Sequence, residues 1–246
     1  MFEDLKPHIQ DLRNRLMVCV ASVLVAFLVC FSFWKHIFEW IKAPLNAAFS
    51  SKEVSGMLIQ ISPAEGVIAA MKVSFFAALL ISMPIIFWQL WLFVAPGLYK
   101  NEKKVVLPFV IFGTLMFLGG AAFAYYVVFP ITIKFILMFG NEEFQANISV
   151  SSYITFFTRV VIGFGVAFEL PVLAYFLAKI GLITDATLKE YFKYAIVIIF
   201  ILAAIITPPD VISQLFMALP LIGLYLLSIL IAKIVNPAPK EDKQEE

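Results

Sequence analysis

Long apolar runs constrain this 246-residue chain more than any other feature. A helix needs about 20 mostly apolar residues to cross the ~30 Å hydrocarbon core of a bilayer. Apolar residues make up 62% of the chain and charged residues 14%, which excludes a water-soluble globular domain. The sequence therefore predicts an all-α membrane protein with six transmembrane helices, the fifth clearly shorter than the others, at residues 16–34, 67–95, 105–129, 153–178, 194–206 and 211–232.

The six spans are expected to form one membrane domain over residues 1–235, followed by a disordered cytoplasmic tail at 236–246. Aromatic and charged residues alternate after the first span, at 34–42, and predict a short helix lying in the outer interface. The sequence Ser62-Pro63-Ala64-Glu65 has the form of a capping box and predicts that the second helix begins before Val67. Prolines within spans predict bends at Pro84, Pro171 and Pro220.

Lys and Arg are unevenly distributed over the predicted loops. The two tails and the second and fourth loops carry 12 of the 18, whereas the first and third loops carry 4. Cytoplasmic loops are enriched in these residues. We therefore expect both termini in the cytoplasm.

Signatures of enzymatic or metal chemistry are missing from the chain. His8 and His36 lie outside the spans, the two cysteines have no metal-ligand spacing, and no P-loop or GxSxG occurs. A net charge of +1 offers no footprint for nucleic acid. We expect no catalytic residue, no metal site and no cofactor.

Polar residues inside spans are the main pointer to function, because a charge at the bilayer centre is costly. Lys72 and Arg159 lie near the outer ends of their helices and are expected to snorkel. Glu169 lies deep in the fourth span, and helical spacing places Thr158 and Gly165 on its face. This stripe predicts a polar site that faces protein or water. A protonated Glu169 bound to a neighbouring helix is the structural alternative.

Three other carboxylates have modest interpretations when each is taken alone. Asp11 is spaced to pair with Arg15 at i,i+4, and Glu102 is one charge among lysines in the second cytoplasmic loop. Asp210, after two prolines, could simply end a turn.

Several motifs together resemble the TatC family, the large receptor subunits of the twin-arginine (Sec-independent) protein translocase. The resemblance extends along nearly the whole chain. The family usually has glutamate at the position of Asp11. In order, the motifs are His8…Asp11-Leu12-Arg13-x-Arg15, Ala43-Pro44-Leu45, Gln89-Leu90-Trp91-x-Phe93-x-Ala95-Pro96-Gly97-Leu98-Tyr99-Lys100-x-Glu102, Phe123-Ala124-Tyr125-x-Val127-Val128-Phe129-Pro130, Phe164-Gly165-Val166-x-Phe168-Glu169-x-Pro171 and Thr207-Pro208-Pro209-Asp210.

The resemblance implies a receptor in the bacterial cytoplasmic (inner) membrane for the Arg-Arg signal peptides of folded proteins. It assigns signal binding to Asp11 and Glu102, with Arg13 and Phe93 in the same motifs. A carboxylate accepts both arms of a guanidinium, which a lysine cannot reproduce.

The resemblance also implies that small single-span partners of the TatA and TatB type dock at the intramembrane site of Glu169, Thr158 and Gly165. It makes self-association possible. Pro44, Tyr125 and Asp210 are motif residues with structural roles.

The short fifth span suggests a locally thinned bilayer, because residues 194–206 rise only about 20 Å as a helix. Two other functions stay open on the residues alone. One is a proton-coupled transporter that uses Glu169, and the other is a membrane scaffold or insertase.

Overall fold

The computed structural model describes residues 2–50, 56–94, 106–139, 146–207 and 210–238, almost all of them helical. Glu102 and the segment 239–246 lie outside the described residues. The elements, in chain order, are α1 (Phe2–Ser32), α2 (Trp34–Phe49), β1 (Gly56–Ile59), α3 (Glu65–Val94), α4 (Val106–Phe123), the π-helical η3 (Ala124–Val128), α5 (Phe129–Met138), β2 (Ala146–Ser149), α6 (Val150–Ala167), α7 (Glu169–Lys179), α8 (Asp185–Glu190), α9 (Phe192–Ile206) and α10 (Val211–Val235).

The predicted membrane architecture is confirmed. Five helical stretches are long and apolar enough to cross a bilayer, and Phe192–Ile206 is the shorter sixth. The third span runs on to Met138, beyond the predicted 129, because η3 joins α4 to α5 without a loop. The fourth span is interrupted at Phe168, where Pro171 has no N–H to donate to the carbonyl of Ala167.

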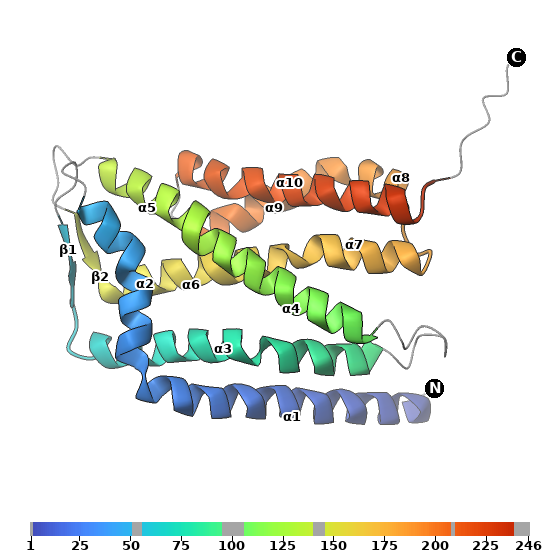
Figure 1. The fold of residues 1–246 in the computed structure, drawn as a ribbon, viewed down its shortest axis with the longest axis horizontal. Coiled ribbons are helices and arrows are strands. Elements are labelled where there is room, and N and C mark those ends of the chain that lie inside the picture. The colour runs from blue at the N-terminus through green and yellow to red at the C-terminus, as the bar shows by residue number, and fades with distance from the viewer. Residues whose placement is uncertain (1, 51–55, 95–105, 140–145, 208–209, 239–246) are drawn as a thin grey trace, which may run out of the picture.

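The helices lie side by side as an elongated bundle with two different ends (Figure 1). One end carries α2, β1 and β2, and we call it the sheet end. At the other, which we call the terminal end, α1 begins, α3 and α7 end, α8 lies, and α10 ends. The first and last described helices thus begin and finish at the same end of the bundle.

A small parallel sheet at the sheet end was not predicted. β1 pairs with β2 in register from Gly56 opposite Ala146 to Ile59 opposite Ser149. A Cβ at Gly56 would lie 2.3 Å from the carbonyl oxygen of Ala146, so only glycine permits this approach of the strands. The sheet joins the segment before α3 to the segment before α6.

The main core lies between α2, α3, α4, η3, α5, α6, α9 and α10 and is rich in aromatic side chains. Phe76 and Phe129 pack edge-on against Phe157, and the Tyr153 ring stacks beside it. All four side chains are essentially inaccessible. By contrast, α1 packs along α3 and leaves most of its apolar surface exposed, as expected for a helix that faces lipid.

Candidate functional site

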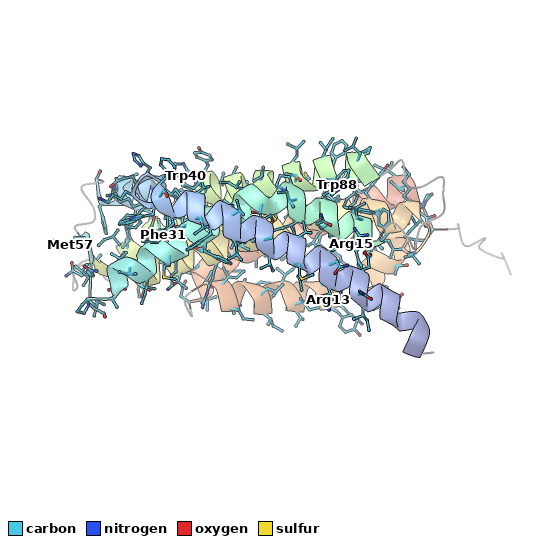
Figure 2. All side chains as sticks on the ribbon, turned by 90° about the horizontal axis from the view of Figure 1, so that it is seen from below. Arg13, Arg15, Phe31, Trp40, Met57 and Trp88 are labelled. Carbon is cyan, nitrogen blue, oxygen red and sulfur yellow. The ribbon has the colours of Figure 1, made fainter. Side chains whose placement is uncertain are left out.

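The acidic residue predicted to bind signal peptides lies near the start of α1 and already has a partner. Nε of Arg15 donates a 2.8 Å hydrogen bond to Oδ2 of Asp11, one helical turn away. The Asp11 side chain remains 39% exposed and that of Arg15 21%. Arg13 is exposed, and Figure 2 shows both arginines near the terminal end of α1, with Phe31 and Trp40 toward the sheet end.

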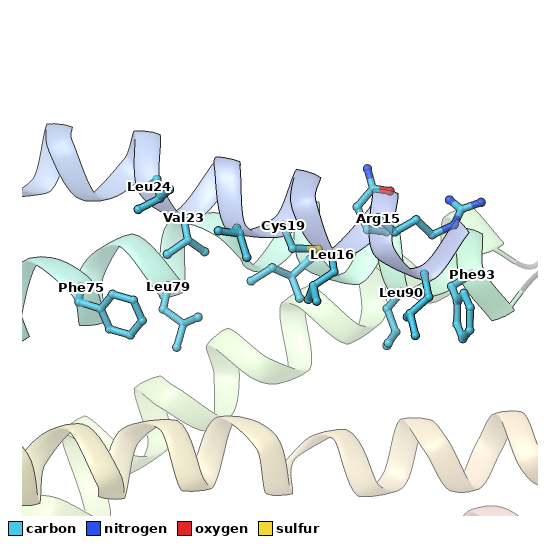
Figure 3. A pocket seen from close by; sticks show the side chains of 13 residues that line it. Arg15, Leu16, Cys19, Val23, Leu24, Phe75, Leu79, Leu90 and Phe93 are labelled. Carbon is cyan, nitrogen blue, oxygen red and sulfur yellow. The ribbon is translucent and has the colours of Figure 1, made fainter. Parts of the chain in front are cut away.

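A groove of about 400 Å³ runs between α1 and α3 and ends beside this pair. Its lining is apolar except for Arg15, the thiol of Cys19 and the amide of Gln89. Figure 3 shows Arg15 and Phe93 at one end of the groove and Phe75 at the other. The structure thus brings Phe93 close to the helix that carries Asp11, as the motif assignment requires.

The carboxyl group of Glu169 is buried in the middle of the bundle, in the first turn of α7. The residue is 7% exposed, and its Oε1 has no hydrogen-bond partner among the described residues. A Cβ at Gly113 of α4 would lie 3.3 Å from Oε2 of Glu169 and 3.6 Å from the ring of Phe87. Glu169 therefore faces protein, not lipid, as its sequence position predicts.

Gly165 and Thr158, which were predicted to share the face of Glu169, also face protein. Gly165 is buried, and a Cβ there would lie 2.8 Å from the ring of Phe117 on α4, so the glycine lets α6 and α4 approach closely. The hydroxyl of Thr158 is inaccessible, with no hydrogen-bond partner in the described part of the chain. Beside Glu169 a second core of aromatic and aliphatic side chains fills the terminal half of the bundle, formed by Met83, Phe87, Trp91, Phe109, Val110, Phe117, Val172 and Phe176.

Two motif residues, Pro44 and Tyr125, complete one structural unit. Pro44 lies inside α2 and cannot donate to the carbonyl of Trp40 four residues earlier. The hydroxyl of Tyr125, in η3, donates to this carbonyl at 2.9 Å, and its ring stacks on the Trp40 ring with centroids 4.1 Å apart. The tyrosine therefore satisfies the acceptor that the proline leaves without a helical partner.

Glu65 has a wider role than the predicted capping box. Its Oε2 accepts from the backbone N–H of Ile61 at 2.6 Å and, more weakly, from that of Ser62 at 3.3 Å. Its Oε1 accepts from the hydroxyl of Ser149 and from the N–H of Ser151 at 2.8 Å, at the start of α6. One carboxylate thus holds the beginnings of two helices, of which the sequence pattern indicated only the nearer.

Lys72, which was expected to snorkel, has partners on a neighbouring helix that the sequence did not predict. Its Nζ donates to the hydroxyls of Ser151 at 2.9 Å and Thr155 at 2.8 Å. These two hydroxyls lie one turn apart near the start of α6 and supply the ammonium group with protein partners. Arg159 is exposed, in agreement with expectation.

Two further acids, Asp210 and Asp185, form hydrogen bonds near helix ends. Asp210 is the N-cap of α10 and accepts from the N–H of Ser213 at 2.6 Å. Asp185 in α8 accepts from Nζ of Lys189 at 2.7 Å and from the N–H of Ala238 at 2.9 Å. These bonds, Lys189 foremost, lower the pKa of the Asp185 carboxyl.

The C-terminal segment is tied back at the terminal end. Besides the bond from Ala238 to Asp185, the amide of Asn236 donates to the carbonyl of Ile183 at 2.9 Å. The described part of the predicted tail, 236–238, is therefore held against the loop around α8. Across the described residues, no group of three or more His, Cys, Asp or Glu is arranged to hold a metal ion.

Comparison with known proteins gives a consistent result. The family described as Sec-independent protein translocase protein (TatC) matches residues 7–220. The chain is 70% identical over 245 residues to the TatC protein of Helicobacter pylori strain J99, covering 100% of this chain and 95% of that protein. It is 53% identical to the TatC protein of Campylobacter jejuni over the full length of both.

Solved structures agree. A crystal structure of the twin-arginine translocase receptor TatC superposes with a TM-score of 0.84 at 38% sequence identity. The match covers 93% of this chain and 99% of that one.

Proposed function

The chain belongs to the TatC family, and from this membership we propose how it binds signal peptides and partner subunits. It is a multi-pass bacterial membrane protein and the receptor subunit of the twin-arginine translocase, a transport component and not an enzyme. The family favours this role over the proton-coupled transporter and the scaffold that the residues alone left open.

We propose that Asp11 and Glu102 bind the Arg-Arg pair of a signal peptide, with Arg13 and Phe93 beside them. The observation that carries this assignment is the partly exposed carboxylate of Asp11, which is bonded to Arg15 where Arg15 and Phe93 line the end of the groove (Figure 3). Each acid can accept one guanidinium through two parallel hydrogen bonds. The apolar part of the peptide then lies along the apolar lining of the groove.

Capture of a precursor by the purified protein tests this proposal. Wild type should retain an Arg-Arg precursor and lose it when both arginines are replaced by lysine. Asp11→Asn and Glu102→Gln should each abolish the preference. Glu190→Gln is the matched control, since Glu190 is an exposed acid on α8 at the same end. Equal retention of both precursors by wild type would refute the assignment.

We further propose that single-span subunits of the TatA and TatB type dock at Glu169, Thr158 and Gly165. In support, Oε1 of Glu169 and the hydroxyl of Thr158 are both buried without a partner in the described chain. Burying such groups is costly unless a hydrogen bond compensates. Glu169→Leu should lose co-purification of the small subunits while Arg-Arg precursor capture persists. Glu169→Gln should retain part of the co-purification and all of the capture.

We propose that both termini lie on the cytoplasmic side of the inner membrane. The excess of Lys and Arg in the tails and even-numbered loops supports it, and the first and last described helices share one end of the bundle (Figure 1). Labelling of single cysteines introduced at Ala238 and Met57 in intact cells should reach Met57 only.

The short α9 supports local thinning of the bilayer. Its 15 residues rise about 22 Å against a core of about 30 Å. Spin labels along α9 should report a hydrocarbon thickness several ångströms below that around α10, and equal thickness would contradict the proposal.

A further inference from the structure

The acid assigned to signal recognition is already paired within its own helix. Arg15 donates to Asp11 through Nε, the same kind of group that a twin-arginine signal peptide offers. We propose that Arg15 is an internal competitor that holds Asp11 until a guanidinium of the signal peptide replaces it. This inference rests on the proposed function and adds a residue to it.

The pair is suited to exchange because it is weak and accessible. Both partners lie on one helix face, and exposed i,i+4 pairs on helices contribute little to stability. The bond engages Nε of Arg15 and one oxygen of Asp11, whereas a carboxylate can accept at several lone-pair positions. A bidentate guanidinium from outside can therefore take over the carboxylate at a small net cost.

The groove offers Arg15 a place after release. Its side chain lines the same end as Phe93, and the amide of Gln89 lies in that lining (Figure 3). The carbonyl oxygen of Gln89 can accept from a guanidinium, and an aromatic face can hold one by a cation–π contact. The guanidinium of Arg15 can thus leave Asp11 without being placed against purely apolar side chains.

Arg15 acts on affinity more than on selectivity. Every peptide that uses Asp11 must release the same pair, so the cost is common to Arg-Arg and Lys-Lys versions. The selectivity comes from the bidentate geometry that arginine alone provides. An internal competitor keeps binding reversible, which a receptor that must hand its cargo on requires.

Titration of the purified full-length protein with a labelled Arg-Arg signal peptide tests the proposal. Arg15→Gln should tighten binding about two- to fivefold, the factor that corresponds to a pair of ~0.4–1 kcal/mol. Arg15→Lys should give a smaller change, because an ammonium group still pairs with Asp11. Lys233→Gln removes a cation at the same end of the bundle and should leave the affinity unchanged.

The double variant separates exchange from general electrostatics. In an Asp11→Asn background, Arg15→Gln should have no effect, and a persistent gain would overturn the proposal. If Arg15→Gln weakens binding or leaves it unchanged while Asp11→Asn weakens it, the competitor is refuted and signal recognition by Asp11 stands. If Asp11→Asn itself binds as wild type does, both fail.

Discussion

The sheet end of the bundle and the start of α1 at the terminal end are held in different ways. At the sheet end, polar groups join elements far apart in the chain: Glu65 to the start of α6, Tyr125 to the carbonyl of Trp40, and Tyr153 to that of Ile41. At the terminal end of α1, Asp11 and Arg15 bind only each other among the described interactions, four residues apart on one helix.

The sheet end is therefore structurally fixed, whereas the pair of Asp11 and Arg15 can change partners. Side chains that satisfy distant backbone groups cannot leave without orphaning a buried partner, whereas a local surface pair can exchange. The motif residues at the sheet end therefore maintain structure, whereas Asp11 can exchange its partner without orphaning a distant group.

The sharpest test of the comparison is Glu65→Ala at the sheet end. It leaves the hydroxyl of Ser149 and the backbone N–H groups of Ile61, Ser62 and Ser151 without their acceptor. We expect the largest loss of thermal stability of all variants described here, measured by unfolding in detergent micelles. A melting temperature equal to that of wild type would show that water replaces the carboxylate without cost.

The next effect concerns the unit of Pro44 and Tyr125. Tyr125→Phe should lower the free energy of unfolding by ~1–3 kcal/mol, because it orphans the carbonyl of Trp40. Pro44→Ala restores an N–H for that carbonyl, so the cost of Tyr125→Phe should shrink in the double variant. Strict additivity across this cycle would disprove the coupling.

Asp210 should show an intermediate effect. Asp210→Ala removes the N-cap of α10 and should cost ~1 kcal/mol of unfolding free energy, whereas Asp210→Asn retains a good cap and should cost little. Equal losses in the two variants, measured under the same micellar conditions, would point to a role for the charge itself.

Asp11 should contribute least to stability. Asp11→Asn removes a partly exposed i,i+4 pair and should change the free energy of unfolding by less than ~0.5 kcal/mol, while signal-peptide binding is weakened. Should stability fall as far as in Glu65→Ala, the distinction between the two ends would be wrong.

At the terminal end, the contribution of Asp185 to stability should depend on pH but stay constant around neutral pH. Because the folded pKa of Asp185 is lowered, its contribution is complete above the ordinary Asp range and is lost as pH falls through the folded pKa. Carboxyl NMR should find a titration midpoint below that of an unstructured Asp. Lys189→Met should raise the midpoint, and an unchanged midpoint would exclude Lys189 as the main cause.

Sequence reasoning predicted the elements that depend on composition and local spacing. Span length and hydropathy located the membrane helices, and helical spacing placed Glu169 and Gly165 on a protein-facing stripe. Asp11 with Arg15 followed from the i,i+4 rule.

The contacts across the bundle could not be predicted in this way. Four-residue strands such as Gly56–Ile59 carry too little alternation to be recognised. The bonds from Glu65 and Lys72 to Ser151 join residues about 80 positions apart, and only the packing of α3 against α6 brings them together. The π-helical turn at Tyr125 likewise has no local sequence signal.

The attachment of α1 mainly to α3 has a mechanical consequence. The helical stretch from Asp11 to Phe33, where the chain turns into α2, is about 33 Å long. Under the proposed binding at Asp11, a load applied by cargo acts near the terminal end of α1, far from the turn at Phe33. Under this proposal, pulling on the signal sequence would load α1 and its packing against α3 before the other helices.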